Sequence, residues 1–184
     1  MILERVKNEV ASINFIKEHT SIPVPNVRCA FEDNGRYYIV TDIVPGVTMA
    51  ELAEEQKATV MEELEGYIEQ MHSLKSKVLG GVLGDVCIPF RLIDHVDLFI
   101  FHNLPEAETA EYVFCHNDLS QHNILVDKET LKINAIIDWE YAGFFPLEFD
   151  SPFYLRSGPS VAIGDEVDDT AKLLGFLREL EAQN

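Results

Sequence analysis

The chain has 184 residues, of which 47% are hydrophobic and 25% are charged. This length and composition predict one globular domain with a real core, and they exclude a disordered or fibrous protein. Lysine and arginine number 14 against 32 aspartate and glutamate residues, which gives a formal net charge of −18. Because a surface this negative repels nucleic acid and anionic membranes, we expect neither as a partner.

The cysteine pattern and the first residues bear on the cellular compartment. Cys29, Cys87 and Cys115 are widely separated and form no C-x-x-C pair, which is typical of reduced thiols. The chain becomes charged directly after its start, so no signal peptide is predicted. The longest apolar run, near residues 98–101, is too short to span a bilayer. We therefore expect a soluble, cytoplasmic protein.

The first part of the chain predicts a helix followed by a hairpin. Apolar residues recur at helical spacing over residues 2–19, and Pro23 and Pro25 prevent the helix from continuing. Two strands are predicted over residues 27–31 and 37–43, because an Asn-Gly pair between them suits a hairpin turn.

The remainder alternates between helical and strand patterns. Helices are predicted over residues 59–74, 94–103 and 165–181. Short apolar runs predict strands over residues 112–115, 124–126 and 133–137. Helices mixed with a small β-rich centre indicate the α+β class.

Residues 116–123 read His-Asn-Asp-Leu-Ser-Gln-His-Asn and carry the clearest chemical signal. They match H-x-D-L-x-x-x-N, the catalytic loop of protein-kinase-like phosphotransferases. In those proteins a metal-binding aspartate follows the catalytic loop, and Asp138 in the segment 136–140 stands at that position. Such a loop places Asp118 to accept a proton from a substrate hydroxyl. Oxygens of Asn123 and Asp138 then meet one divalent cation, and so few oxygen ligands suit Mg²⁺.

These motifs together resemble the aminoglycoside phosphotransferase and choline-kinase-like family of the protein-kinase-like fold, in particular its fungal members. Residues 22–27 resemble the link after kinase helix αC, and residues 38–46 resemble the hinge strand. Ser120 stands where Ser/Thr protein kinases have a lysine, and Asp-Trp-Glu at 138–140 replaces Asp-Phe-Gly. The resemblance covers most of the chain and implies a kinase-like α+β fold.

The resemblance also implies roles for individual residues. Asp118 is the catalytic base or orients the substrate hydroxyl, and Asn123 and Asp138 hold Mg²⁺. Hinge backbone bonds the adenine of ATP above an apolar floor, and the residues given these nucleotide-binding roles are Asp42, Ile43, Val44, Leu125 and Ile137.

The activity implied by the resemblance is transfer of the ATP γ-phosphate to a hydroxyl of a small, cationic metabolite. An acidic cluster that includes Asp118, Asp138, Glu140 and Asp150 would attract ammonium groups. For Glu140 the open roles are contact with the cationic substrate, a second metal or an ordinary surface acid. For Asp150 they are contact with the substrate, bracing of the catalytic loop from beneath or an ordinary surface acid.

The chain departs from the family pattern near its start. The glycine-rich turn and the phosphate-binding lysine should precede Glu9, which matches the helix glutamate of the family, and neither is present there. We therefore expect a remnant N-lobe and hinge at 1–46 and a kinase-like C-lobe at 47–184. A lone hairpin is marginal in water, so the N-lobe is expected to be mobile or covered by a partner or a second copy. Without the lysine, Glu9 is expected to be a solvated helix residue.

Three other interpretations compete with an active kinase. The missing lysine favours a catalytically inactive, pseudokinase-like binding module. A remote alternative is a metal-dependent hydrolase with the ligands His116, Asp118, His122 and Asp138. In a third, Asp118, Asn123 and Asp138 are merely turn-forming and capping residues. His116 is expected to be a buried histidine bonded to backbone.

Overall fold

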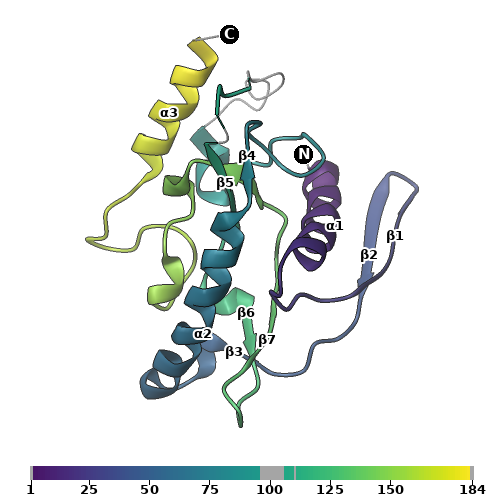
Figure 1. Cartoon of the computed structure of the whole chain (residues 1–184), viewed down its shortest axis with the longest axis vertical. Coiled ribbons are helices and arrows are strands. Elements are labelled where there is room, and N and C mark those ends of the chain that lie inside the picture. Colours follow the sequence, from purple (N-terminus) through teal and green to yellow (C-terminus); the bar gives the residue numbers. More distant parts are fainter. Residues whose placement is uncertain (1, 96–105, 110, 183–184) are drawn as a thin grey trace.

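The computed structural model describes residues 2–95, 106–109 and 111–182 (Figure 1). Its three α-helices in these ranges are α1 (Ile2–His19), α2 (Glu54–Ser73) and α3 (Thr170–Ala182). In Figure 1, α1 lies on one side of the molecule and α3 on the other, with α2 between them. No helix of the described part is both long and apolar enough to cross a bilayer. Helices mixed with short strands give the predicted α+β class.

Short antiparallel strands form three small sheets in the described residues. The first sheet is the hairpin of β1 (Val27–Asp33) and β2 (Arg36–Thr41). The second has the order β3 (Val47–Thr48), β6 (Ile124–Val126) and β7 (Ile133–Ile136). The third has the order β4 (Lys75–Ser76), β5 (Tyr112–Cys115) and β8 (Gly143–Phe145). Residues 116–123 therefore connect the middle strands of two sheets.

Helix α1 has the predicted bounds, and it is tied to the middle of the chain. Ile13 and Ile16 are buried on its inner face. The side-chain nitrogen of buried Asn8 donates to the carbonyls of Ala142 (2.8 Å) and Glu140 (3.1 Å). The first helix thus packs directly against the segment that follows Asp138.

The predicted hairpin forms, with slightly different strand ends. Asn34 and Gly35 take positive φ angles of 49° and 73°, as a tight turn between two strands requires. Strand β2 ends at Thr41 rather than at residue 43, and the next residues leave the sheet. The residues predicted to contact adenine, Asp42, Ile43 and Val44, therefore lie in irregular chain after β2.

Two predicted helix starts are wrong. Helix α2 begins at Glu54 rather than at residue 59, because the Gln56 side chain accepts the amide of Ala53 (3.1 Å) and closes an earlier first turn. Helix α3 begins at Thr170 rather than at residue 165. The Glu166 carboxylate instead closes a separate turn by accepting the amide of Ile163 (2.9 Å).

The helix predicted over 94–103 lies mostly outside the described residues. The chain that precedes it, Phe90–His95, forms a 3₁₀ helix. This short element begins after Pro89, whose carbonyl accepts the amide of Leu92 (2.9 Å). This element contains Arg91, which is buried.

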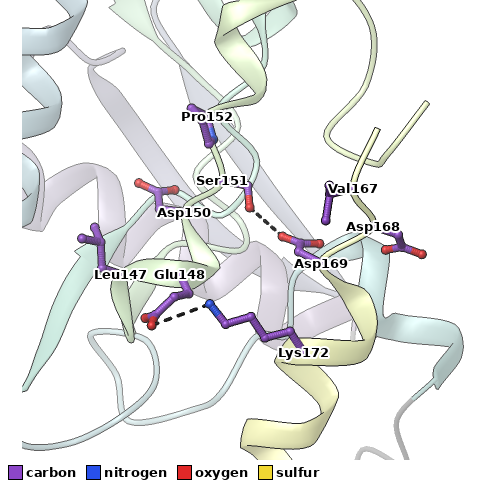
Figure 2. A pocket seen from close by; sticks show the side chains of 9 residues that line it. All are labelled: Leu147, Glu148, Asp150, Ser151, Pro152, Val167, Asp168, Asp169 and Lys172. Carbon is purple, nitrogen blue, oxygen red and sulfur yellow. Dashed lines mark hydrogen bonds and ion pairs between the residues drawn. The ribbon is translucent and has the colours of Figure 1, made fainter. Parts of the chain in front are cut away.

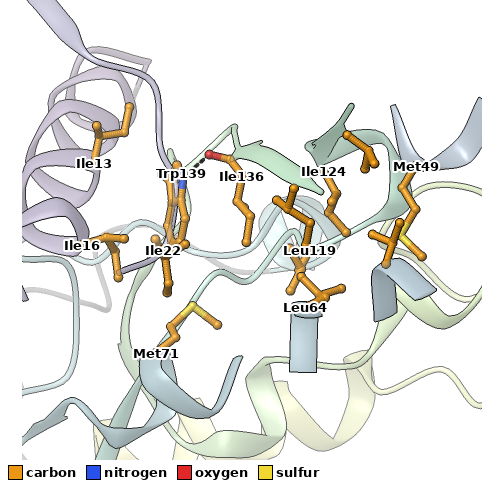
Figure 3. Close-up of a cluster of buried hydrophobic side chains, with 14 of the residues drawn as sticks. Ile13, Ile16, Ile22, Met49, Leu64, Met71, Leu119, Ile124, Ile136 and Trp139 are labelled. Atoms are coloured by element: carbon orange, nitrogen blue, oxygen red, sulfur yellow. Dashed lines mark hydrogen bonds between the residues drawn. The ribbon is translucent and has the colours of Figure 1, made fainter. Parts of the chain in front are cut away.

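The larger of two buried hydrophobic clusters supports residues 114–139. Trp139 is fully buried at its centre, near Ile13 and Ile16 of α1 and Met71 of α2 (Figure 3). The Trp139 indole nitrogen donates to the carbonyl of Ile136 (2.8 Å). The second cluster packs β5 and β8 against α3. Both clusters therefore fix the strands that lead into and out of residues 116–123.

Candidate active site

His116 anchors the start of the candidate catalytic loop. It is fully buried, and its ring lies 4.5 Å from that of Trp139, measured between centroids. Its Nε2 donates to the carbonyl of Ile137 (3.0 Å), and its Nδ1 accepts the amide of Asp118 (3.3 Å). Both ring nitrogens hold backbone, as expected for a structural histidine.

Asn123, Asp118 and Asp138 lie in one hydrogen-bonded neighbourhood. The side-chain nitrogen of Asn123 donates to the backbone carbonyl of Asp118 (2.8 Å). The backbone carbonyl of Asn123 accepts the amide of Ile137 (2.9 Å), the residue before Asp138. Asp138 follows directly, with a φ of 67°. Burial raises the pKa of Asp138, and the nearby carboxylates of Glu140 and Asp118 raise it further. The loop and the end of β7 thus bring these acids close enough to repel each other.

This donor set fits Mg²⁺. Because the Asn123 nitrogen bonds backbone, its oxygen points away from that bond, and carboxylate and amide oxygens are ligands that Mg²⁺ accepts. A cation would favour the charged form of Asp138, which burial and neighbouring acids disfavour. In the described ranges no three His, Cys, Asp or Glu residues gather as a metal site. Water and substrate oxygens would complete the coordination of Mg²⁺.

The structure does not bring together the ligands of the hydrolase alternative. His116 is buried with both ring nitrogens bonded to backbone, whereas His122 is exposed. Together with Asp118 and Asp138 they form no metal-binding group among the described residues. The hydrolase hypothesis required all four side chains to converge.

Helix α1 adds two residues that the sequence did not single out correctly. Glu9 is half-buried rather than solvated, and burial, Asp138 and Glu140 together raise its pKa to about 7. Arg5 pairs with Glu140 through Nε and Oε2 (3.1 Å), and its guanidinium carbon lies 4.5 Å from the centroid of the Tyr141 ring. Arg5 thus supplies positive charge beside an otherwise acidic group.

Asp150 faces inward. Its Oδ1 accepts the amide of Asn117 (3.0 Å), and its Oδ2 lies 2.8 Å from Nε2 of His72. Its side chain is only 5% exposed. Asn117 takes a φ of 66° and donates from its side chain to the carbonyl of Tyr141 (2.8 Å). Of the roles considered for Asp150, this geometry favours bracing of the loop.

The predicted hinge residues differ in which of their groups already have partners within the chain. The Asp42 amide donates to the carbonyl of Asn26 (3.0 Å), and its carboxylate pairs with Arg28 (Nε–Oδ1 2.5 Å). The Ile43 side chain is 96% exposed, and that of Val44 is half-buried. The Asp42 amide is therefore already used within the chain, in contrast to the adenine contact implied for it.

The chain after the hinge reaches the predicted apolar floor. The carbonyl of Pro45 accepts the side-chain nitrogen of Asn134 (2.8 Å). In the next strand, Thr48 lies opposite Leu125 in the β3–β6 pairing. Leu125 and Ile137 are both half-buried. The second sheet therefore links the hinge to the strand that carries Leu125.

A cleft of about 460 Å³ lies behind the loop, between residues 147–152 and the start of α3 (Figure 2). Its lining includes Asp150, which holds the Asn117 amide, and Asp169, which accepts the Ser151 hydroxyl (2.6 Å). No local pattern in the sequence pointed to this acidic cleft, because its walls come from two separate segments.

Two aminoglycoside phosphotransferases of known structure share this fold. The type VIII aminoglycoside-3'-phosphotransferase is 21% identical with a TM-score of 0.57, covering 82% of this chain and 63% of that one. The Streptomyces rimosus enzyme in complex with ADP and streptomycin is 15% identical with a TM-score of 0.57, covering 96% and 75%. The predicted kinase-like fold is thereby confirmed.

Two sequence relatives match different shares of the chain. The aminoglycoside 3'-phosphotransferase of Streptomyces fradiae is 26% identical over 156 residues, covering 72% of this chain and 57% of that protein. The probable choline kinase 3 of Arabidopsis thaliana is 49% identical over 51 residues, which are 26% of this chain and 14% of that protein. This chain thus spans little more than half of the first relative.

Residues 36–156 match the family model for choline/ethanolamine kinase. The chain belongs to this family. The resemblance that the loop and hinge indicated is confirmed, whereas membership of a fungal branch stays a prediction.

Proposed function

We propose that the protein is an ATP- and Mg²⁺-dependent phosphotransferase that acts on a hydroxyl of a small, cationic metabolite. The observation that carries this proposal is the hydrogen-bonded neighbourhood of Asp118, Asn123 and Asp138. His116 at one end of the loop and Asn123 at the other bond the backbone amide and carbonyl of Asp118, so the point from which its carboxyl extends is fixed before substrate arrives.

Each of these residues then has one task. Asp118 orients the substrate hydroxyl and takes up its proton. The Asn123 oxygen and the Asp138 carboxylate would hold Mg²⁺, which supplies charge neutralisation for the phosphate oxygens when bound. The loop contains no Lys or Arg, and Arg5 supplies positive charge that interacts with Asp138. We assign Asp150 to bracing of the loop, and not to substrate binding.

Nucleotide use is supported by likeness to solved phosphotransferases whose names include bound ADP or GDP. We infer that adenine lies beside the hinge, with the backbone of Ile43 and Val44 as partners and Leu125 and Ile137 beneath. Asp42 is the weakest member of this set, since its amide already donates to Asn26. The proposed boundary between an N-lobe at 1–46 and a C-lobe at 47–184 falls after the hinge.

A cationic substrate is supported by charge. The net charge is −18, and Glu9, Asp138 and Glu140 lie close enough to raise the pKa of Glu9. Acidic groups around a site attract ammonium ions and raise their local concentration. Choline and ethanolamine, named in the family description, and streptomycin, bound in a similar structure, are the first compounds to test.

The test combines binding and turnover. Titration calorimetry with ATP is performed with and without Mg²⁺, and ADP release is then measured with each hydroxyl compound. We expect Asp138→Asn to lose Mg²⁺-dependent ATP binding. We expect Asp118→Asn to keep this binding while turnover falls by about 10²–10⁴. Asp127→Asn, at an exposed turn of the same hairpin, is the control and should leave both unchanged.

The outcomes separate the rivals. Binding without turnover of any compound would favour the pseudokinase-like module. Absence of ATP binding with and without Mg²⁺ would contradict both the kinase and the nucleotide-binding module.

A further inference from the structure

Arg91 joins the candidate catalytic loop to the start of α3. Its side chain is only 3% exposed. The guanidinium bonds Asp169 through two pairs of atoms, Nε–Oδ1 and Nη2–Oδ2, each 3.0 Å apart. Its Nη1 donates to the carbonyl of Asn117 (3.2 Å), and its Nη2 donates to the carbonyl of Phe149 (2.8 Å). One buried cation thus contacts three segments of the chain.

Residue Asn117 is consequently held from both sides. Its carbonyl accepts from Arg91, and its amide donates to Asp150 (3.0 Å). The partner of Arg91, Asp169, also accepts the hydroxyl of Ser151 (2.6 Å; Figure 2), which is next to Asp150. Arg91 and Asp150 therefore hold the two consecutive peptide groups on either side of the Asn117 Cα, and Asp169 and Ser151 connect them.

We propose that Arg91 is a positioning residue that fixes the direction in which Asp118 leaves the loop backbone. Asp118 follows Asn117 directly, so rotation of the held Asn117 carbonyl would turn the Asp118 carboxyl away from a bound hydroxyl. Arginine suits this place because its planar fork reaches a carboxylate and two carbonyls at once, which the ammonium of lysine does not. The inference rests on the proposed phosphotransferase function and adds to it a residue outside the motif.

Arg156 provides a matched control. Its guanidinium carbon lies 5.3 Å from the centroid of the Phe153 ring, and that of Arg91 lies 5.2 Å away from the same centroid. Arg156 also pairs with an acid before α3, Glu166 (Nε–Oε1 2.7 Å), and donates to backbone, including the carbonyl of Pro159 (2.8 Å). Among the described residues, its hydrogen bonds, ion pair and ring contact do not reach residues 116–123, so it has a similar structural role without the proposed positioning role.

The experiment compares Arg91→Lys with Arg156→Lys in the full chain. With the compound that gives turnover, we expect Arg91→Lys to lower kcat about 10- to 100-fold, since small misplacement of a reacting group is costly. The KM for ATP should stay within about two-fold, because the hinge and the metal residues keep their contacts. Arg156→Lys should leave kcat unchanged even where its melting temperature falls equally.

Hydrogen–deuterium exchange supplies a readout that needs no activity. We expect amides of residues 114–123 to exchange about ten-fold faster in Arg91→Lys and to be unaffected in Arg156→Lys. Equal exchange and equal kcat in the two variants would overturn the proposal. A wild-type chain without turnover would contradict the proposed function, while exchange would still decide whether Arg91 holds the loop.

A second variant keeps the proposal testable if Arg91→Lys does not fold. Asp169→Asn keeps Arg91 and its two carbonyl contacts but removes the opposing charge, and the Asp169 side chain is 19% exposed. We expect a smaller loss of kcat than in Arg91→Lys, with faster exchange of the same peptide. Unchanged exchange in Asp169→Asn, if Arg91→Lys does not fold, would overturn the proposal.

Discussion

The loop of residues 116–123 and the β1–β2 hairpin are held in opposite ways. In the loop, the buried side chains of Arg91 and Asp150, from two other segments, bond the backbone of Asn117. On the hairpin, Phe31 and Tyr38 are 48% and 40% exposed, and their rings stack on each other at 5.2 Å between centroids. The comparison teaches that the geometry of the loop is specified by buried contacts within the chain, whereas the hairpin is specified mainly by its own turn and pairing.

The first prediction tests the core beneath the loop. Trp139→Ala should lower the free energy of unfolding by about 3–5 kcal/mol, because it empties a fully buried indole site. Urea unfolding measures this change. Trp139→Phe is the control, and its smaller loss reflects the missing volume and the lost bond to Ile136. A loss under about 1 kcal/mol for the alanine variant would show that the loop does not depend on this core.

The second prediction removes a brace. Asp150→Asn should lower the free energy of unfolding by about 2 kcal/mol, because it replaces the charged acceptor that faces Asn117 and His72 with a neutral amide. Chemical denaturation gives the cost. The neighbouring Glu148→Gln should be nearly neutral, because Glu148 is 55% exposed and pairs only loosely with Lys172 (3.8 Å). Equal effects of the two substitutions would contradict the bracing role.

The third prediction concerns pH. The pKa of Glu9 rises from its ordinary value of 4.5 to about 7 in the folded chain, mainly because of burial, so the folded state binds more protons between these values. Stability should therefore fall as pH rises from about 4.5 to about 7, by about 2 kcal/mol after allowance for partial exposure.

Glu9→Gln provides the comparison for this pH effect. Melting temperatures across the range should show a shallower decline in the variant than in the wild type. Parallel curves would contradict a raised pKa for Glu9 in the folded chain. Glu18→Gln, an exposed glutamate on the same helix, should keep the wild-type slope.

The smallest effect is expected on the hairpin. Phe31→Ala should lower the free energy of unfolding by only about 0.5–1.5 kcal/mol, because it removes the ring that stacks on Tyr38. A double-mutant cycle with Tyr38→Ala measures the coupling. A larger cost that grows with protein concentration would indicate that a second copy covers this face. The contrast between the two regions would then hold only for the isolated chain.

Local patterns predicted the elements whose signals are strong. The helical spacing of α1 and the apolar runs of β5 and β6 gave correct bounds. The two-residue strands β3 and β4 are too short to show an alternating apolar pattern, and β8 is only Gly-Phe-Phe. Their pairing depends on tertiary contacts, as at Gly143, where an added Cβ would lie 2.7 Å from the carbonyl oxygen of Gly80.

The residues of the candidate site also divide into those that a local motif marks and those that only tertiary contacts place. Asp118, Asn123 and Asp138 were predicted because a motif with fixed spacing marks them. Arg91 and Arg5 were missed, because each bonds an acid far away in the sequence, 78 and 135 residues distant. Glu9 was judged by its missing lysine, whereas its surroundings are set by how α1 packs on the segment after β7.

The left-handed backbone at Asn117 and Asp138 limits what evolution or a mutant library accepts at these positions. Asparagine, aspartate and glycine tolerate such a conformation, and β-branched residues do not. A library selected for folding alone should thus retain this narrow set at both sites. Retention of aspartate at 138 is favoured by backbone shape as well as by chemistry, and a glycine substitution there separates the two pressures.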